Sequence, residues 1–309
     1  MTTPGELVAL IARYAPGDGT FPCAIPGVQL IRASAPTMPM PVIYEPTVCF
    51  VAQGGKRAML GTTAFDYAAG NHLVASVGLP VMGAVVEASE AAPYLSLQLD
   101  LDAAELSELA VRYPPPPDAR PMRVAGLMLF ESDAGLLDAA ARLVRLLDTP
   151  DDIEMLAPIT IREILYRLIT APGGTVVRDM AQGESRLSHI AQAIVWIRAH
   201  FREACRIETA AEVAGMSRST FHQHFKAVTA MTPIEFRTQL RLQEARRIML
   251  SNGLDAASAG FAVGYDSPSH FSRDYARLFG RPPGKDIQRL RALTFPSSTL
   301  GHTRIEPGA

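Results

Sequence analysis

The sequence predicts an α+β protein of two domains, a β-barrel followed by helices and then an all-helical domain. From Gly27 to about Leu101, short apolar segments are separated by Gly, Pro and polar turns. From His189 to about Leu290, the apolar residues recur at helical spacing instead. The 309 residues are enough for two separate cores. The expected division is residues 1–170 for the first domain (barrel about 27–105, helices about 131–170), a linker at 171–188, the helical domain at 189–290 and a disordered tail at 291–309.

Six segments of the first half have the composition of strands, being rich in apolar and β-branched residues and bounded by turn signals such as Gly54-Gly55. Every second residue from Leu95 to Leu101 is leucine, so this segment would have one apolar face. Many short strands at such spacing are typical of a small barrel or jelly roll. The six segments are residues 42–44, 47–53, 56–60, 71–76, 80–86 and 94–99.

Two helices are expected after the barrel, at residues 134–147 and 151–170. Asp151 and Asp152 lie where the second would begin, and acidic residues stabilise a helix N-terminus. The first has an apolar stripe that a partner helix could cover, which would make the protein a homodimer. The alternative is that the stripe packs against its own barrel. The stripe consists of Leu136, Ala140, Leu143 and Leu147.

The composition is that of a globular protein, with 48% hydrophobic and 19% charged residues. No apolar run reaches the ~18–20 residues that span a bilayer, and the first residues lack a signal-peptide pattern. The three cysteines, Cys23, Cys49 and Cys205, are widely spaced. Such spacing favours a reducing compartment over a disulfide framework or a zinc site. We therefore expect a cytoplasmic protein with no membrane partner.

The net charge of −2 conceals an uneven distribution. Residues 189–290 have a net charge of +5 and contain five of the seven histidines, whereas the remainder has a net charge of −7. A basic domain attached to an acidic one is expected of a DNA-binding domain with a separate sensing or assembly module.

Residues 207–228 contain, in order, the parts of a helix-turn-helix unit. A short helix of small residues would have its N-cap at Thr209, with Glu212 completing a capping box. Gly215 would form the turn. Ser217 would then cap a second helix, in the position of a recognition helix.

A second unit with the same parts follows at residues 255–279, after a connecting helix from Pro233 to about Leu250. At ~1.5 Å per residue the connecting helix is ~25 Å long, which would set the two units about one DNA turn, ~34 Å, apart. Two units in tandem indicate a protein that contacts two successive major grooves of duplex DNA. The repeated parts are the cap Asp255, the turn Gly264, the cap Ser267 and Pro268 at the first helical position.

Residues 189–290 resemble the DNA-binding domain of AraC/XylS-type regulators. The resemblance is carried by residues 241–247 (RLQEARR), 260–273 (GFAVGYDSPSHFSR) and 279–283 (FGRPP). It implies a seven-helix domain that binds asymmetric DNA sites and regulates transcription, commonly as an activator that contacts RNA polymerase. The sequence departs from the pattern at residues 257–259, Ala-Ser-Ala, where an Ile-Ala pair usually precedes Gly-Phe.

The resemblance also implies which side chains face DNA. Those that would contact bases are Ser219, His222 and Gln223 in one groove and Ser269, Ser272 and Arg273 in the next. Those that would contact phosphates or groove edges are Ser217, Arg218, Thr220, Lys226, Ser267 and His270.

Residues 27–105 resemble the N-terminal domain of a subset of these regulators. The segments that carry this resemblance are residues 44–56, 71–81, 87–89 and Pro93-Tyr94. It implies a cupin-like barrel that binds an effector and dimerises. The candidate effector pocket comprises Cys49, Tyr67, His72, Met82 and Tyr94, each of which could instead belong to the core.

An enzyme with a metal-dependent cupin fold would need several converging His or carboxylate ligands, commonly two His two residues apart. His72 is the only histidine before His189. We therefore expect no metal, no cofactor and no catalytic residue. Cys49 lies in an apolar run, where a buried thiol is the default, although a redox-sensing or electrophile-sensing thiol is an alternative.

The sequence therefore predicts a sequence-specific DNA-binding transcription regulator, an activator that responds to a small molecule in the barrel and associates with the bacterial nucleoid. The alternatives are a regulator that is independent of ligand or responds to oxidants or electrophiles, and a cupin-type enzyme fused to a DNA-targeting domain.

Overall fold

The protein is described here by a computed structural model that covers residues 4–115, 125–171, 173–183, 185–203 and 206–294. The chain divides into two compact units. The first unit consists of Met1–Ala199 and Arg206–Phe236, and the second consists of His200–Cys205 and Arg237–Ala309. Within the described residues, no helix is long and apolar enough to cross a membrane.

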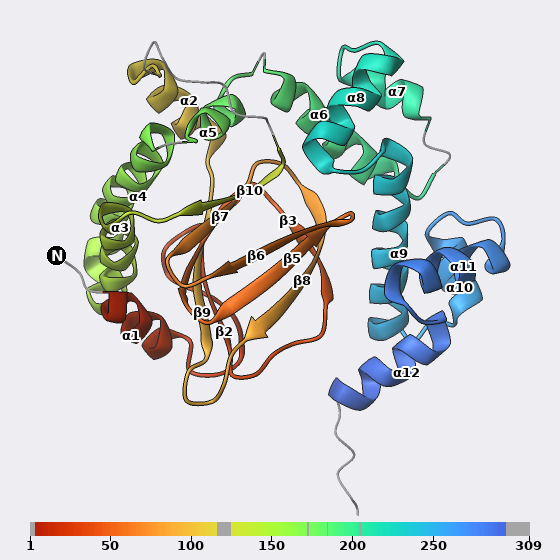
Figure 1. Ribbon diagram of the computed structural model, residues 1–309, viewed down its shortest axis with the longest axis horizontal. Helices are drawn as coiled ribbons and strands as arrows, with labels where there is room; N and C mark the ends of the chain where they lie inside the picture. The colour runs from red at the N-terminus through yellow and green to blue at the C-terminus, as the bar shows by residue number, and fades with distance from the viewer. Residues whose placement is uncertain (1–3, 116–124, 172, 184, 204–205, 295–309) are drawn as a thin grey trace, which may run out of the picture. The chain divides into compact units, whose positions relative to one another are not determined.

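Two sheets form the walls of a barrel in the first unit (Figure 1). All strand pairs are antiparallel. The six-stranded sheet has the order β1 (Gly19–Pro22), β2 (Val28–Ala33), β9 (Tyr94–Asp100), β4 (Thr47–Gln53), β7 (Asn71–Ala75) and β10 (Leu127–Glu131). The four-stranded sheet has the order β3 (Met40–Tyr44), β8 (Leu79–Glu87), β5 (Gly55–Leu60) and β6 (Thr63–Ala68).

Each of the six expected strands is present within two residues of its predicted bounds, as β3, β4, β5, β7, β8 and β9. The sequence patterns did not identify β1, β2, β6 and β10. The strand β6 alternates poorly and has exposed residues at Thr63, Ala64 and Asp66, because it lies at the edge of its sheet. An edge strand can carry polar and charged side chains, so its composition resembles that of a loop.

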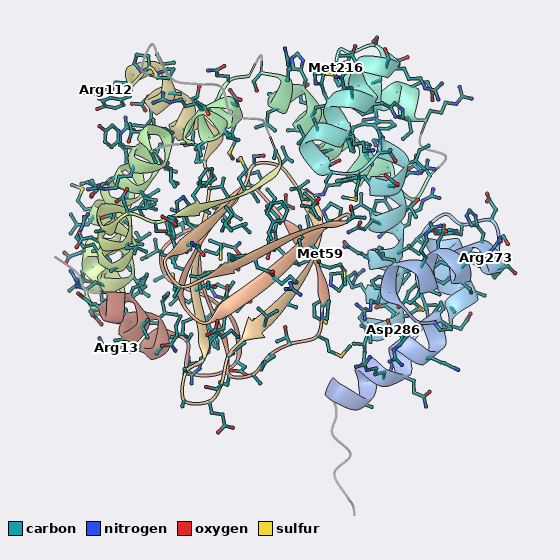
Figure 2. The ribbon with its side chains drawn as sticks, in the orientation of Figure 1. Arg13, Met59, Arg112, Met216, Arg273 and Asp286 are labelled. Carbon is teal, nitrogen blue, oxygen red and sulfur yellow. The ribbon has the colours of Figure 1, made fainter. Side chains whose placement is uncertain are left out.

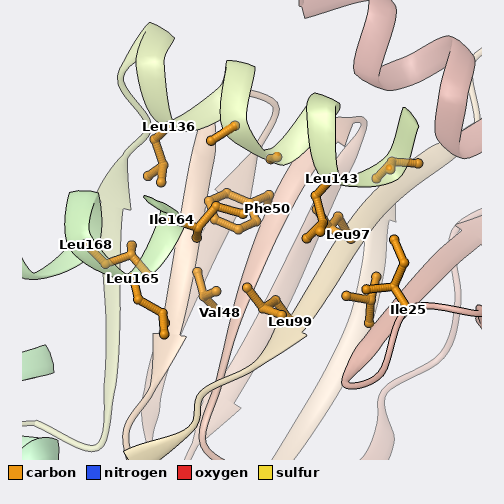
Figure 3. Packing of buried hydrophobic residues seen from close by; sticks show 14 of the residues in the cluster. Ile25, Val48, Phe50, Leu97, Leu99, Leu136, Leu143, Ile164, Leu165 and Leu168 are labelled. Carbon is orange, nitrogen blue, oxygen red and sulfur yellow. The ribbon is translucent and has the colours of Figure 1, made fainter. Parts of the chain in front are cut away.

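Helices cover one face of the six-stranded sheet and form the largest core with it (Figure 3). Val48 and Phe50 of β4 and the leucines of β9 point toward α3 and α4, where Leu143 and Ile164 meet them. Burying such side chains contributes about 1.5–3 kcal/mol each. The helices of this region are α1 (Pro4–Tyr14), α2 (Ala103–Arg112), α3 (Ala134–Arg145), α4 (Ile153–Thr170) and α5 (Thr175–Ala181), with two short 3₁₀ turns between α3 and α4.

The apolar stripe of the first predicted helix packs against its own barrel. Leu136, Ala140 and Leu143 are at most 1% exposed and belong to the core that α3 shares with the sheet. Its fourth member, Leu147, lies beyond α3 in a 3₁₀ turn and packs against the same core. The dimer seam expected on this stripe is therefore wrong, because the sheet of the same chain already covers it.

The rest of the described chain is helical. Its elements are α6 (Arg186–His200), α7 (Ile207–Val213), α8 (Arg218–Thr229), α9 (Pro233–Ser251), α10 (Ala256–Ala262), α11 (Pro268–Phe279) and α12 (Pro283–Thr294). The compact units and the predicted domains divide the chain differently, since α6, α7 and α8 fall in the first unit. Helix α5 lies within the expected linker, and α12 continues four residues past the expected start of the tail. The remainder of that tail, residues 295–309, lies outside the described residues.

Candidate nucleic-acid interface and effector site

The first helix-turn-helix unit consists of α7 and α8. Gly215 forms the turn with a φ of +61°, in the left-handed region that favours glycine. Ser217 caps α8 as predicted, since its hydroxyl accepts a hydrogen bond from the backbone N–H of Thr220 at 3.3 Å. Phe221 and Phe225 of α8 are fully buried. The opposite face of α8 presents exposed polar side chains.

The predicted start of α7 is wrong. The helix begins at Ile207 with Arg206 at the N-cap, and no side chain caps it. Thr209 is therefore inside the first turn and forms no capping box with Glu212. The first helical residue, Ile207, is only 7% exposed. The start of α7 therefore coincides with a buried residue and not with a capping side chain. A capping box does form two helices later, where the side chains of Thr232 and Glu235 accept from each other's backbone N–H groups at the start of α9.

The side chains expected to face DNA from the first unit lie on the exposed side of α8. Ser219 and Gln223 are exposed, whereas His222 is half-buried and its Nε2 is covered. Arg218 is paired with Glu208 across 3.1 Å, although both side chains are more than half exposed. The other expected phosphate or edge contacts, Ser217, Thr220 and Lys226, are exposed.

The second unit consists of α10 and α11. Asp255 caps α10 by accepting from the N–H groups of Ala257 and Ser258, and Ser267 caps α11 with Pro268 at its first position, all as predicted. Gly264 forms the turn with a φ of +89°. A Cβ at Gly264 would lie 2.0 Å from the carbonyl oxygen of Arg202, so no other residue fits this turn.

The expected DNA-facing side chains of the second unit also lie on one exposed side. Ser269 and Arg273 are exposed and Ser272 is half-buried, and Arg273 lies at the outer surface of its unit (Figure 2). The Arg273 Nε donates to the carbonyl of Ser269 at 3.4 Å, one turn earlier. The expected phosphate or edge contacts Ser267 and His270 are exposed.

A buried polar network holds the second unit together, and sequence patterns did not reveal it. Arg246 of α9 and Asp286 of α12 form an ion pair in which both side chains are at most 4% exposed. The Tyr275 hydroxyl donates to the same carboxylate at 2.8 Å, and the Arg246 guanidinium lies 4.4 Å from the centre of the Phe279 ring. Arg241 donates to three backbone carbonyls, those of Phe201, Glu203 and Gly264. This network gives a structural role to Arg241 and Arg246.

Within the first compact unit, two contacts join the barrel to α6 and α8. Glu45 directly follows β3, and its carboxylate accepts two hydrogen bonds from Arg198 of α6 at 2.8 and 2.5 Å. The backbone N–H of Gly126 donates to the carbonyl of Val228 in α8 at 2.7 Å. A cavity of about 710 Å³ lies beside this contact, and the exposed face of α8 contributes Gln223 and Lys226 to its lining.

Three of the five residues of the expected effector pocket come together inside the barrel. Since Val48 and Phe50 face the helices, Cys49 faces the four-stranded sheet, and Tyr94 faces it from β9 by the same alternation. Tyr67 of β6 faces back, and its hydroxyl lies 3.2 Å from that of Tyr44. Burial raises the pKa of Tyr67 and of Tyr94 well above its ordinary value, with further contributions from Cys49 and Tyr44. All three side chains are at most 5% exposed.

The structure does not bring the other two residues into this group. His72 pairs in register with Phe50, on the helix-facing side of the sheet, and its ring packs against Phe50 and Phe130. Burial lowers the pKa of His72 to about 4, and Nδ1 lies 2.9 Å from the Ser132 hydroxyl. Gly83 and Val85 of β8 pair with Ala58 and Lys56 on the inner face of the four-stranded sheet. Met82 alternates with them and pairs with Met59, so it lies on the outer face.

Lys56 is a residue of the barrel interior that sequence reasoning missed. It alternates with Ala58 and Leu60, both buried, and its ammonium lies 5.4 Å from the centre of the Tyr44 ring. The signal was present in this alternation, but a lysine in a strand is usually interpreted as exposed. Of the cysteines, Cys23 is half-buried, Cys49 is buried in the barrel, and Cys205 lies outside the described residues.

Comparisons with known proteins cover both halves of the chain. Residues 24–176 match the family described as "AraC-type transcriptional regulator N-terminus", and residues 210–289 match a helix-turn-helix domain family. The HTH-type transcriptional activator RhaS of Escherichia fergusonii is 28% identical over 161 residues, which are 52% of this chain and 56% of RhaS. The RCS-specific HTH-type transcriptional activator RclR of Escherichia coli is 35% identical over 108 residues, which are 35% of this chain and 37% of RclR.

The chain thus spans about half the length of RhaS and just over a third of RclR. Among solved structures, apo ToxT from Vibrio cholerae strain SCE256 aligns with a TM-score of 0.52, covering 88% of this chain and 98% of ToxT. At 9% identity this likeness concerns the fold alone. Since the sheet-rich half and the helical half each match the corresponding family, the chain belongs to the AraC-type transcriptional regulators.

Proposed function

We propose that this protein is a transcription activator that binds a specific site on duplex DNA through two recognition helices and responds to a small molecule in its barrel. The observation that carries the proposal is the pair α8 and α11. Each is capped by serine, is buried on one side by aromatic residues and exposes a short row of polar side chains on the other. This is the arrangement by which a helix enters the major groove.

Helix α9 is continuous over 19 residues between the two units, which gives it a length of ~28 Å. We assign α8 and α11 to adjacent major grooves on this basis. The base contacts would come from Ser219, His222, Gln223, Ser269, Ser272 and Arg273, and the phosphate or edge contacts from Ser217, Arg218, Thr220, Lys226, Ser267 and His270. Gln suits adenine and Arg suits guanine, each by two hydrogen bonds, so Gln223 and Arg273 would discriminate most.

The barrel would control the first unit through the contacts that join them. Glu45 holds Arg198 of α6, and Gly126 holds the end of α8 at Val228. While these contacts persist, α8 is restrained and the exposed Gln223 and Lys226 line a cavity next to the barrel. An effector that moves β3 would release α6, the helix that precedes the first helix-turn-helix unit. Family resemblance favours RNA polymerase as the partner at the promoter, which would place the site of action at the nucleoid in the cytoplasm.

A homodimer would form through the outer face of α4. Met155 and Ile159 are 73% and 61% exposed, one turn apart, and Tyr166 lies on the same face two turns later. Exposed apolar side chains gathered on one face of a helix favour an interface. Ile159→Asp should convert a dimer into a monomer in sedimentation analysis, whereas Val111→Asp, at an exposed position on α2, should not. A monomeric wild-type protein would exclude this interface.

Affinity purification of fragmented genomic DNA by the full chain, at physiological salt, tests the proposal as a whole. We expect enrichment of a few promoter-proximal sites with two conserved boxes about 10 base pairs apart. Retention that is sequence-independent and disappears with added salt would contradict a specific operator in the free protein.

A further inference from the structure

The recognition helix α11 of the second helix-turn-helix unit contains a nearly buried carboxylate. The Asp274 side chain is 11% exposed, and three other side chains converge on it. The Tyr265 hydroxyl donates to Oδ2 at 3.1 Å, and the Nε2 of His270 lies 3.3 Å from the same oxygen. The Arg277 guanidinium donates to Oδ1 at 2.9 Å. Burial of a charge is costly unless the charge is paired and hydrogen-bonded, and here both oxygens of the carboxylate have partners.

The partners of Asp274 differ in exposure, one being inside the unit and two at its surface. Tyr265 is 7% exposed and directly follows the turn glycine, and the Arg241 guanidinium lies 5.9 Å from the centre of its ring. Burial and the nearby carboxylate raise the pKa of Tyr265, so its hydroxyl remains a proton donor at neutral pH. His270 and Arg277, in contrast, are 61% and 77% exposed. Asp274 therefore connects the buried end of the turn to two basic side chains on the surface of α11.

These two exposed side chains lie beside the row that is expected to contact bases. His270, Asp274 and Arg277 are spaced i, i+4 and i+7 on α11, so they share one face of the helix. Ser269 and Arg273, which are proposed to contact bases, form the neighbouring row, since each directly precedes a member of this face. When such a helix lies in a major groove, the side chains beside the base-contacting row face the phosphates that border the groove.

The first helix-turn-helix unit has a different set of residues at the equivalent positions. Helices α8 and α11 have 12 residues each and follow a serine cap, so equivalent positions differ by 50 in the numbering. His224 then occupies the place of Asp274, and Ala227 stands where α11 has Arg277. The carboxylate and its arginine partner therefore belong to the second unit alone, which favours a role in the half of the DNA site that α11 contacts.

We propose that Asp274 is a positioning residue that determines the DNA specificity of the second unit, by holding the Arg277 guanidinium where it meets one backbone phosphate of the correct site. The inference rests on the proposed function, because it requires α11 to lie in a major groove. A guanidinium has five N–H donors, so Arg277 can bond Asp274 and a phosphate at the same time. The 77% exposure of the Arg277 side chain leaves its outer donors accessible to such a phosphate.

Two physical effects make an arginine that is held in place more selective than a free one. A free arginine follows any phosphate within its reach and so adds affinity for every sequence. An arginine that is already ordered loses less conformational entropy on binding, but only where a phosphate lies at its position. The Asp274 carboxylate acts in the same direction, because it repels phosphates that the arginine does not pair, and added salt weakens this repulsion.

The test compares binding of the full chain to the operator recovered by affinity purification and to a shuffled duplex of the same length and composition, over a range of salt concentrations. Asp274→Asn removes the charge and keeps an oxygen that can accept from Tyr265. It should weaken binding to the operator by about threefold to tenfold, and leave binding to the shuffled duplex unchanged or tighter because a negative charge is gone. A purely structural role would weaken both alike, and a purely electrostatic role would strengthen both alike; either result would contradict the inference.

Arg277→Gln tests the same inference at an exposed position, where the core of the unit is not altered. Binding to the operator should fall at least about threefold more than binding to the shuffled duplex, and the salt slope for the operator should decrease by about one. The double variant with Asp274→Asn should bind the operator about as Arg277→Gln does, since the two residues act as a unit. Equal losses on both duplexes would make Arg277 a general phosphate contact and overturn the proposal.

The matched control is Asp266→Asn, which removes one negative charge from an exposed residue next to Tyr265. It should strengthen binding to both duplexes equally or leave both unchanged. A loss of preference as large as that of Asp274→Asn would mean that the charge alone matters, against the proposal. If the wild type does not distinguish the operator from the shuffled duplex, the proposed function is wrong together with the role of Asp274. If it does, and Asp274→Asn retains the full preference, only the role of Asp274 is wrong.

Discussion

The turn glycines of the two helix-turn-helix units have different surroundings. A Cβ on Gly215 in the first unit would meet open space, whereas a Cβ on Gly264 in the second would overlap the carbonyl of Arg202. The two units have the same order of parts but differ in what surrounds them. Aromatic rings form the core of the first, with Phe225 in edge-to-face contact with Phe236 at 5.3 Å between ring centres. The core of the second also contains aromatic rings, among them Phe271 and Tyr275, and adds the buried pair Arg246–Asp286 and the contacts of Arg241.

This difference suggests a division of labour between the units. The first unit contacts the barrel at Val228, and the preceding helix α6 contacts the barrel through Arg198. The second has a close turn and a geometrically demanding polar core, which resists alternative arrangements. We infer that the first unit is the one an effector adjusts and the second is the fixed reference for DNA binding.

The largest contrast is expected between Gly264→Ala and Gly215→Ala. At Gly264 the new Cβ would overlap a backbone carbonyl and the φ is positive, so the second unit should lose its folded turn, and protection of α11 from hydrogen exchange should fall. At Gly215 only the positive φ matters, which costs about 1–2 kcal/mol. Similar losses at both glycines would remove the proposed difference between the units.

The next effect concerns the ion pairs. Asp286→Asn leaves the Arg246 charge buried without its partner and should lower the free energy of unfolding by about 3–5 kcal/mol in denaturant melts. The matched variant in the first unit is Glu208→Gln, which breaks the exposed pair with Arg218. It should change the free energy of unfolding by less than about 1 kcal/mol. A small effect of Asp286→Asn would contradict the rigid polar core.

Single side chains on the recognition helices should separate the two units in DNA binding. Arg273→Ala and Gln223→Ala should each cost about 1–3 kcal/mol of affinity and relax discrimination at one position, in different halves of the site. Lys226→Ala should weaken binding to all sequences and reduce the salt slope by about one. A titration against a library of operator variants measures all three. Loss of discrimination in the same half for Arg273→Ala and Gln223→Ala would contradict the tandem arrangement.

The smallest effect is expected at the contact between the barrel and α6. Glu45→Gln should scarcely change stability, because an exposed pair contributes about 0–1 kcal/mol. It should raise DNA affinity without effector by up to about fivefold, since α6 is no longer held. The control is Asp66→Asn, which breaks the exposed Arg57–Asp66 pair on the barrel surface. Equal affinity for both variants would argue against a restraint at Glu45.

Local signals in the sequence predicted local structure well. Ser217, Asp255, Ser267 and Pro268 were identified as helix starts because a cap and its helix are adjacent in the chain. The predicted cap at Thr209 was wrong although the local capping pattern was present, because α7 begins two residues earlier at the buried Ile207. The exposed faces of α8 and α11 followed from the spacing of their aromatic residues, although the roles of the exposed side chains still rest on resemblance.

Features that depend on distant residues could not be predicted. Arg246 and Asp286 are 40 residues apart, and only folding brings them together. The face to which Lys56 belongs depends on the pairing of β5 with β6 and β8, and the expected pocket residues His72 and Met82 fall on other faces for the same reason. Cys49 and Tyr94 lie on the face opposite the leucines of β9, and their place in an effector pocket stays a prediction.

Hydroxyl-radical footprinting of the enriched operator tests the central claim, a tandem reader of two grooves, most directly. The wild type should protect two windows centred about 10 base pairs apart. Gln223→Ala should weaken one window and Arg273→Ala the other. A single protected window, or two windows that weaken equally in both variants, would contradict the account.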